Sequence, residues 1–254
     1  MNKHLSIVIL THNNEDVLNR ALESVIGIGK VLVVDSGSTD KTLNICNEFK
    51  VDLVINKFTS FKDQRNFALS IVDTEYTLFL DSDEKISQSL RNFLINDFKA
   101  VEQNVDINIF EIFRTEFYDN IEVVYGFGRS NYQTRLIRTK QVYYDGDVHE
   151  FPVCKDGKIT KKLDSSLRID HNPNRDLNSI LNRLVPYARL ASNKKIKNGR
   201  KVSLLIMILN FNYQLLRLCW NGRKDGRAGI IAAWCEALSR AITYLYIYDH
   251  NNKN

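Results

Sequence analysis

The chain has 254 residues, of which 44% are hydrophobic and 26% are charged, an ordinary composition for a globular protein. That length suffices for one large domain, or for a domain with an appendage, around a hydrophobic core. Its four cysteines form no C-x-x-C pair and therefore suggest neither a zinc site nor a disulfide framework. The apolar run near the N-terminus is too short for a signal peptide, which makes the cytoplasm the expected compartment.

Charge is distributed unevenly along the chain. Residues 1–154 carry 16 Lys or Arg and 23 Asp or Glu, whereas residues 155–201 carry 13 and 4, and residues 202–254 carry 6 and 3. An acidic first part and a basic second part suggest two different tasks. A phosphate-rich partner or an anionic membrane surface would suit the basic part. A solvated, Lys-rich helical face explains it equally well.

Short apolar runs alternate with helix-spaced segments through the first 80 residues. The runs are typical of strands covered on both faces, and they span residues 5–10, 31–34, 51–55 and 76–80. Apolar residues at helical spacing predict helices near residues 17–25, 43–49 and 67–72. This alternation predicts right-handed β-α-β units and a parallel sheet.

Beyond residue 100 the pattern changes from alternation to strands followed by helices. Strands are predicted at residues 107–113, 132–137 and 141–144, and helices at residues 177–188, 202–219 and 228–248. No uninterrupted apolar run approaches the ~18 residues of a spanning helix. Both an amphipathic interfacial helix and a core-facing helix fit residues 202–219.

Three carboxylates, those of Asp81, Asp83 and Glu84, directly follow the fourth predicted strand. An acidic turn is one explanation, because Asp and Ser are good turn residues. A bound cation is the other, because crowded carboxylates repel each other unless something neutralises them. The loops THNNED and DSGSTD follow the first two strands, and ligands bind where such loops leave a parallel sheet. Their convergence favours a functional site.

Several common nucleotide and metal motifs are absent from the sequence. There is no G-x-G-x-x-G after the first strand and no G-x-x-x-x-G-K-[ST], which argues against dinucleotide and P-loop folds. An EF-hand is excluded, because Ile86 stands where its loop requires Gly.

The segments SIVILTHNN, VLVVDSGSTDKT, DQRNFAL and YTLFLDSDE resemble, in order and spacing, the N-terminal signatures of family-2 glycosyltransferases of the GT-A fold. The later segments GDVHEFP, RIDHNPNRDL and NGRKDGRAGIIAAW resemble the small lipopolysaccharide-core glucosyltransferases, more weakly. The resemblance implies an α/β, Rossmann-like GT-A domain over residues 1–175, with a mostly parallel central sheet flanked by helices. A basic, amphipathic C-terminal helical extension over residues 176–254 would pack on it.

The resemblance also implies a site for a nucleotide-sugar donor. Thr11 and Asp35 would line the uracil pocket, and Arg65 would lie beside the base or the diphosphate. An exposed helix charge is the alternative for Arg65. Asp81 would contact the ribose or make a second contact to a metal. The two arginines of TRLIR would either support the phosphates or brace the sheet edge.

A divalent cation, Mn²⁺ or Mg²⁺, is implied at Asp83, with His171 as a late ligand. Glu150 is the candidate base that takes the proton from the acceptor hydroxyl. Many relatives carry Glu-Asp where this chain has His149 and Glu150. His149 would either orient the acceptor or serve as an ordinary loop histidine.

Together these features predict an inverting, metal-dependent transferase. It would move a hexose, with glucose favoured, from a UDP-sugar to a bacterial envelope glycolipid such as the lipopolysaccharide inner core. The lipid-linked acceptor places it at the cytoplasmic face of the inner membrane, as a peripheral protein. A capsule, teichoic acid or protein acceptor is the rival hypothesis.

Two other classes of protein compete with a transferase as explanations of this sequence. A sugar-nucleotide pyrophosphorylase should have a Gly-rich N-terminal loop with a basic residue, which LTHNNED lacks. A non-catalytic module binding nucleic acid or an anionic surface would suit the basic part, but no motif of interleaved aromatic and basic residues supports it. We therefore expect no nucleic-acid partner.

Overall fold

The computed structural model describes residues 2–98, 106–118, 120–125, 131–146, 150–157, 159–172 and 177–253. Its contacts divide the chain into two units. The first comprises Met1–Thr115 and Asn131–Pro173, and the second comprises Glu116–Ser130 and Asn174–Asn254. The boundary expected at residues 175 and 176 stays a prediction, and the contacts group the described residues 116–118 and 120–125 with the C-terminal segment.

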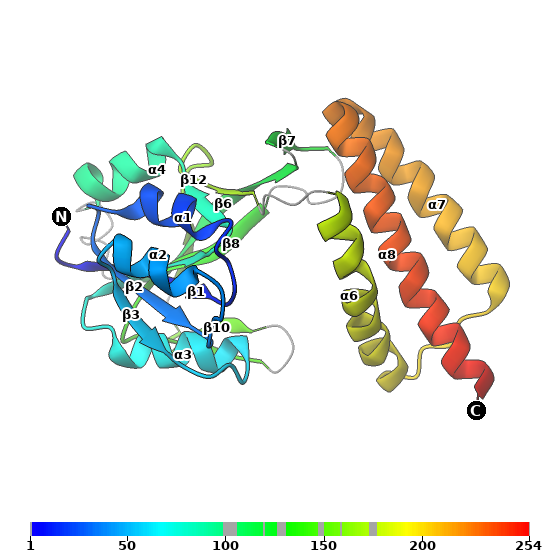
Figure 1. The fold of residues 1–254 in the computed structure, drawn as a ribbon, viewed down its shortest axis with the longest axis horizontal. Helices are drawn as coiled ribbons and strands as arrows, with labels where there is room; N and C mark the ends of the chain where they lie inside the picture. Colours follow the sequence, from blue (N-terminus) through cyan, green and yellow to red (C-terminus); the bar gives the residue numbers. More distant parts are fainter. Residues whose placement is uncertain are drawn as a thin grey trace. The chain divides into compact units, whose positions relative to one another are not determined.

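Four parallel strands form the N-terminal half of the first unit's sheet, in the order β3-β2-β1-β4 (Figure 1). They are β1 (Leu5–Thr11), β2 (Lys30–Asp35), β3 (Asp52–Ile55) and β4 (Tyr76–Asp81). All four predicted strands are thereby confirmed, each to within one residue at either end. Side chains on both faces of β1 are buried, which explains its unbroken apolar sequence.

Helices cover both faces of this parallel half. They are α1 (Leu18–Val25), α2 (Thr42–Glu48) and α3 (Phe61–Ile71). Leu22 of α1 and Cys46 of α2 share one buried cluster with Ile7, whereas Ala68 of α3 lies in another with Val8. Neighbouring residues of β1 thus face opposite layers.

The helix α3 begins six residues before the predicted start. The Ser60 hydroxyl accepts a hydrogen bond from the Asp63 backbone N–H, and Asp63 adds an acidic side chain to the first turn. Both features stabilise a helix N-terminus. The spacing of apolar residues does not predict such a first turn, because its residues are polar.

Antiparallel strands extend the sheet beyond β4 in the order β8-β6-β12-β5. They are β8 (Asn131–Arg138), β6 (Ile107–Tyr118), β12 (Arg168–His171) and β5 (Glu84–Ile86), and β11 (Ile159–Lys162) pairs with β6. After β5 come α4 (Gln88–Asn92) and the π-helical turn η1 (Phe93–Asp97). A separate hairpin joins β9 (Val142–Asp145) to β10 (Phe151–Cys154). The predicted α/β fold is confirmed.

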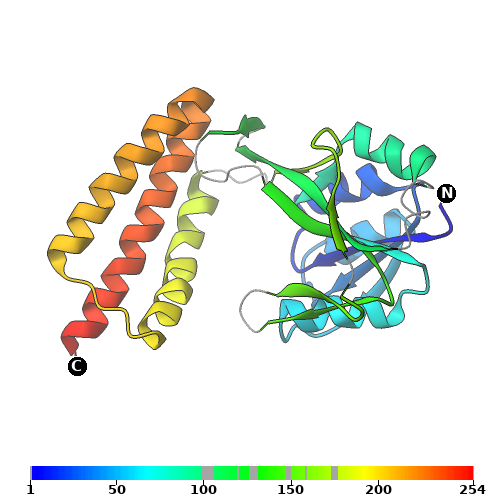
Figure 2. The ribbon, with the colours of Figure 1, turned by 180° about the vertical axis from the view of Figure 1, so that it is seen from behind.

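The second unit is built on three helices, which run beside one another in Figures 1 and 2. They are α6 (Leu177–Lys197), α7 (Leu204–Gly222) and α8 (Gly226–Lys253), with the short η2 (Arg223–Asp225) before α8. The strand β7 (Ile121–Val123) belongs to this unit and pairs with the end of β6. The Asp225 carboxylate accepts the backbone N–H groups of Val124 (3.1 Å) and Tyr125 (2.9 Å). The predicted helical extension is confirmed.

One helical run in the described chain, Leu204–Lys253, is long and apolar enough to cross a membrane by length and composition alone. Its apolar window has a mean hydropathy of 1.2, and 28% of that window is buried. Polar residues such as Asn210, Asn212 and Gln214 interrupt this segment, so it contains no uninterrupted apolar run of the length that a spanning helix needs. Core helices of globular proteins can pass the same test, so the run by itself does not indicate a spanning helix.

Candidate active site

Thr11 and Asp35 lie next to each other where β1 and β2 end. The Asp35 side chain is fully buried, and its Oδ1 accepts the backbone N–H groups of Gly37 (2.8 Å) and Ser38 (2.7 Å). Its Oδ2 accepts the Ser38 hydroxyl. Gly37 has φ of +96°, a conformation that favours glycine, so the loop turns tightly around the carboxylate.

The chain thus brings together the two residues predicted to line a base pocket. Each carboxylate oxygen has the capacity to accept more than one hydrogen bond, and both Asp35 oxygens are covered in this arrangement of the loop. The Thr11 hydroxyl is held by the side-chain amide of Asn14 at 3.2 Å. Their role toward a base stays a prediction.

Asp81, the last residue of β4, is bound by two arginines. Arg135 Nη2 lies 2.6 Å from its Oδ2 and Nη1 lies 3.3 Å from its Oδ1, while Arg65 Nη2 lies 3.5 Å from Oδ1. Loss of water around this carboxylate opposes its ionisation, but the guanidinium groups outweigh that effect and hold the pKa of Asp81 below its usual range. Asp81 is therefore ionised and already neutralised within the protein.

Glu84 is the most buried carboxylate of the cluster, with 1% of the residue exposed. Its Oε1 lies 2.5 Å from Arg135 Nη2 and 3.3 Å from Arg114 Nη1, and its Oε2 accepts the backbone N–H of Asp81 at 3.0 Å. Burial raises the pKa of Glu84, and the charge of Asp81 adds to this, while Arg135 opposes it. Glu84 is recognisable in the sequence as part of the acidic run, but no sequence pattern indicates its role.

Asp83 and His171 meet in the first unit although 87 residues separate them in the sequence. Asp83 lies in the turn between β4 and β5, and His171 ends β12, which pairs antiparallel with β5. The His171 Nε2 atom lies 3.3 Å from Asp83 Oδ2, and about a fifth of each side chain is exposed. The backbone N–H of Asn172 donates to the Asp83 carbonyl at 3.1 Å, which fixes the turn against β12.

This pair fits a divalent cation. A carboxylate oxygen and an imidazole nitrogen at one accessible point are suitable ligands for Mn²⁺, and Mg²⁺ is often held by one or two protein groups together with substrate phosphates. Among the described residues, no three His, Cys, Asp or Glu side chains are grouped as a complete metal site. The protein would therefore share the coordination of the cation with a substrate, and Asp83 and His171 would supply its part.

Arg65 is buried, with 7% of the residue exposed, so the alternative of an exposed helix charge is wrong. Its guanidinium carbon lies 4.9 Å from the centre of the Phe79 ring and 5.3 Å from that of Tyr144. Its Nε atom lies 3.3 Å from Glu150 Oε1, and its Nη2 atom contacts Asp81. One guanidinium group thus joins the candidate base to the acidic cluster, and aromatic rings fix its position.

The two arginines of TRLIR have different roles. Arg135 binds the acidic cluster, whereas Arg138 donates to the Tyr76 hydroxyl at 2.6 Å and pairs with Glu75 at 3.1 Å. Arg138 therefore braces the sheet edge. His149 lies outside the described residues.

Residues 6–149 match the family model described as Glycosyl transferase family 2. The chain belongs to this family. It is a glycosyltransferase, and the polar edge at the ends of β1, β2 and β4 lies within the matched residues.

Relatives of this glycosyltransferase include an enzyme of lipopolysaccharide synthesis. The lipopolysaccharide core biosynthesis glycosyltransferase LpsC of Rhizobium meliloti is 24% identical over 260 residues, which cover 97% of this chain and 93% of that protein. An uncharacterized glycosyltransferase of Rickettsia bellii is 34% identical over 93 residues. That second match covers 36% of this chain and only 32% of the Rickettsia protein.

Solved structures similar to this glycosyltransferase include TarS residues 1–349 from S. aureus. That structure is 15% identical, with a TM-score of 0.49, over 98% of this chain and 91% of the other. Glucosyl-3-phosphoglycerate synthase from Mycobacterium tuberculosis is 18% identical, with a TM-score of 0.37, over 44% of each chain. At such scores neither likeness adds to the fold described above.

Proposed function

We propose that this glycosyltransferase moves a hexose, with glucose favoured, from a UDP-sugar to a bacterial envelope glycolipid, with inversion at the anomeric carbon. The observation that carries the proposal is the meeting of Asp83 and His171 beside an acidic cluster neutralised by arginines. A donor diphosphate is an anion, so it needs a site with cations. Carboxylates alone would repel the diphosphate. Arginines that neutralise Asp81 and Glu84 remove that repulsion.

Thr11 and Asp35 would bind the uracil ring of the donor, and Asp81 would face its ribose. The Asp35 oxygens are fixed by the turn that contains Gly37, so the acceptor of a ring N–H is held in place before the donor arrives. Prior ordering of this kind reduces the entropy lost on binding.

Asp83 and His171 would hold Mn²⁺ or Mg²⁺. When bound, such an ion neutralises the charge that develops on the departing UDP. Glu150 would take the proton from the attacking acceptor hydroxyl. Arg65 orients Glu150 through its 3.3 Å contact and so keeps the base on the Asp81 side of the site.

A lipopolysaccharide inner core is the favoured acceptor, because the similarity to LpsC extends over 97% of this chain and thus includes the C-terminal half. A lipid-linked acceptor implies peripheral association with the cytoplasmic face of the inner membrane. Teichoic acid is the second candidate. The poly(ribitol-phosphate) beta-glucosyltransferase of Bacillus spizizenii is 34% identical over 95 residues, but these cover only 32% of this chain.

Screening UDP-sugars for metal-dependent hydrolysis tests the donor half of the proposal. Hydrolysis should need Mn²⁺ or Mg²⁺, and Asp83→Ala should abolish it together with the stabilisation by UDP and Mn²⁺ seen in thermal unfolding. The exposed Asp52 supplies the matched control, and Asp52→Ala should behave as the parent. Full activity in a chelator would exclude the metal assignment.

Transfer of labelled sugar tests the acceptor half. The donor found in the screen is offered with lipopolysaccharide truncated to its inner core, and separately with a ribitol-phosphate polymer. Label in the lipopolysaccharide alone supports the first candidate, and label in the polymer alone supports the second.

A further inference from the structure

The helix α7 presents an apolar face outward. Leu205 (66%), Leu216 (73%) and Trp220 (66%) are largely exposed, and so are the following neighbours on the helix: Leu204, Ile208, Leu209 and Tyr213. The inward face instead buries Gln214, Leu218 and Gly222. Three and four residues separate Leu205, Leu209, Tyr213, Leu216 and Trp220, so they form one stripe. We call these seven exposed residues the α7 stripe.

The same region carries cations without carboxylates. Residues 177–224, which span α6, the following loop, α7 and the start of η2, contain ten Lys or Arg and no Asp or Glu. An ordinary solvated helix face mixes both signs of charge. This part of the second unit therefore has an excess of cations, most of them on α6 and the loop that leads into α7, and we call it the cationic surface.

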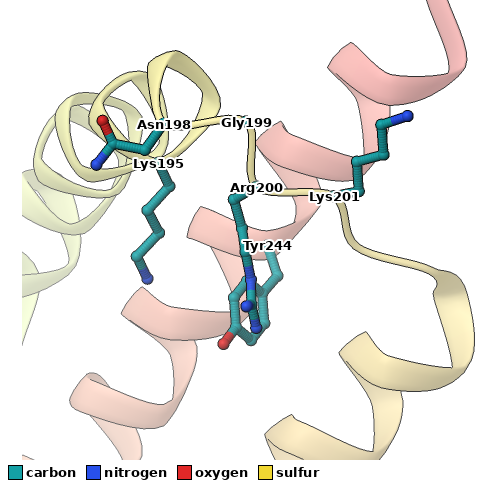
Figure 3. A pocket seen from close by; sticks show the side chains of 6 residues that line it. All are labelled: Lys195, Asn198, Gly199, Arg200, Lys201 and Tyr244. Carbon is teal, nitrogen blue, oxygen red and sulfur yellow. The ribbon is translucent and has the colours of Figure 1, made fainter.

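A hollow of about 630 Å³ lies at the loop between α6 and α7, close to the start of the stripe. Lys195, Arg200, Lys201 and Tyr244 line it together with Asn198 and Gly199, and no carboxylate does (Figure 3). The Lys195 Nζ atom lies 5.2 Å from the centre of the Tyr244 ring. Figure 3 shows the side chains of Lys195 and Arg200 both extending toward Tyr244.

The turn that shapes this hollow is a helix C-cap. The Gly199 N–H donates to the Ile196 carbonyl at 2.9 Å, and the Arg200 N–H donates to the Lys195 carbonyl at 3.0 Å. Gly199 has φ of +73°, which favours glycine there. The cap brings Arg200 back toward Lys195, so two cations from either side of the turn share one space.

We propose that this end of the second unit docks on an anionic lipid bilayer. The hollow takes a headgroup phosphate between Lys195 and Arg200, with Lys201 at its rim, and the α7 stripe enters the boundary between headgroups and acyl chains. The inference deepens the proposed function and rests on it only in so far as a lipid-linked acceptor requires the enzyme at a membrane. Headgroup phosphates match the cations, and acyl chains match the stripe.

Other binding partners match either the apolar stripe or the cations of this surface, but not both. A second copy of the chain would cover the stripe, but it would bring two regions with an excess of cations together. Nucleic acid would match the cations but would leave leucines against water or phosphate. The far end of the stripe also suits a bilayer, because Trp220 stacks 3.4 Å from the Arg223 guanidinium. Aromatic rings and arginines concentrate at the level of lipid headgroups.

Flotation of the full-length protein with vesicles tests the proposal. Phosphatidylcholine vesicles containing phosphatidylglycerol should carry the protein, and pure phosphatidylcholine vesicles should carry far less. The triple variant Lys195→Ala, Arg200→Ala, Lys201→Ala should lose about 100-fold in affinity, the product of three headgroup contacts. Its matched control removes three exposed lysines of the first unit, Lys3, Lys50 and Lys161, and should bind as the parent.

A second variant tests the stripe separately. Leu205→Ser, Leu209→Ser, Leu216→Ser changes side chains that are at least 60% exposed, so folding should not depend on them. Its binding should become fully reversible by salt, whereas the parent resists salt in part. The control replaces the exposed Ile26, Ile71 and Ile95 of the first unit with Ser.

Equal flotation with neutral vesicles, or unchanged flotation of the triple cation variant, would overturn the proposal. So would displacement of the protein from vesicles by duplex DNA, if the leucine changes have no effect on vesicle binding. A protein that forms a dimer and does not bind vesicles, and whose dimer dissociates on the leucine changes, would overturn it as well. Retention through an alkaline carbonate wash would indicate a spanning helix and would also overturn it. UDP binding, measured as the stabilisation of the protein against thermal unfolding, should be unchanged in every variant. A protein that floats but does not bind UDP would refute the proposed function and leave this docking surface standing.

Discussion

Asp81, Asp83 and Glu84 follow one strand within four positions, and the first unit stabilises them in different ways. Arg135 binds Asp81 and Glu84 together, Arg65 adds to Asp81, and Asp83 is turned toward His171. The repulsion of crowded carboxylates is thus removed by buried guanidinium groups rather than by water. The two arginine-bound carboxylates act as a frame, and the third lies beside His171, where the proposed cation would bind.

Arg135→Leu should destabilise the protein by about 3 kcal/mol at pH 7, because Glu84 then stays buried with Arg114 as its remaining cation. Asp81 has a lowered pKa, so its ionised form stabilises the fold above the unfolded value of about 4, and this is lost as pH falls further. The raised pKa of Glu84 acts in the opposite direction. Without Arg135 both carboxylates protonate more readily, so the deficit should shrink as pH falls through 4.

Urea unfolding at several pH values measures this deficit. Lys30→Leu is the matched control, because its partner Asp73 is 73% exposed and the expected loss is about 1 kcal/mol or less. Equal losses for the two variants at pH 7 would contradict the assignment of Arg135 to a buried network.

Glu150→Gln keeps the size of the side chain but removes the proton acceptor. Turnover should fall by about 10²-fold or more, with little change in UDP affinity. Steady-state transfer and UDP titration measure the two quantities. A collapse of UDP affinity instead would place Glu150 in the donor site.

Arg65→Lys should give a partial loss of turnover, because a lysine cannot reach Glu150 and Asp81 with one planar group.

The sequence allowed part of this site to be predicted. Thr11, Asp35 and Asp81 end parallel strands, and the ends of such strands meet at one edge, so their proximity follows from the fold class. The contact between Glu84 and Arg114 does not follow in that way. Both residues belong to the antiparallel half, where pairing depends on long-range register that no local pattern encodes.

Among the elements, β5 and β12 decide where the candidate metal ligands lie. Each has only three or four residues, too few for a periodic signal, and neither was predicted. Their antiparallel pairing sets His171 opposite Glu84 and hence beside Asp83. The resemblance to the family predicted Asp83 and His171 as ligands, and the strand pairing explains why they lie close together.

The junction of α7 and α8 depends on two glycines. A Cβ on Gly229 would lie 2.1 Å from the Gly222 carbonyl oxygen, and backbone there cannot easily move. Gly229→Ala should therefore destabilise the second unit by about 1–3 kcal/mol through overpacking. Helix unfolding followed by circular dichroism measures this.

UDP binding should survive Gly229→Ala, because the donor residues belong to the first unit. Ala191→Ser adds one non-hydrogen atom at an exposed position of α6 and serves as the control. A Gly229→Ala variant as stable as this control would show that the helices can separate without loss.

The amphipathic character of residues 202–219 was predicted, but the two possible roles of its apolar face were not separated by the sequence. The structure shows that Gln214 points inward and bonds to Arg217, while Leu205 and Leu216 point outward. The covered face also buries Leu218 and Gly222, so the helix has a packed face and, opposite to it, an exposed apolar face. Only the packing of α8 against α7 decides which face is covered.

At the scale of the whole molecule, the proposed chemistry and the proposed attachment to a membrane fall in different units. The first unit holds every predicted site residue that the structure describes, and the second contains the cationic surface and the α7 stripe. A division of this kind implies that changes on the stripe affect reactions only when the acceptor is embedded in a membrane. The rates of reactions with an acceptor in solution should not depend on changes to the stripe.

The variant Leu205→Ser, Leu209→Ser, Leu216→Ser should therefore behave differently with two forms of one acceptor. With glycolipid in anionic vesicles, its apparent KM should rise about 10-fold or more, because the enzyme no longer concentrates at the surface that holds the substrate. With the same glycolipid dispersed in detergent, its kcat and KM should match the parent. Hydrolysis of the UDP-sugar in the absence of acceptor should also be unchanged. Parallel losses in vesicles and in detergent would mean that α7 affects the active site directly, and the separation of the two tasks would be wrong.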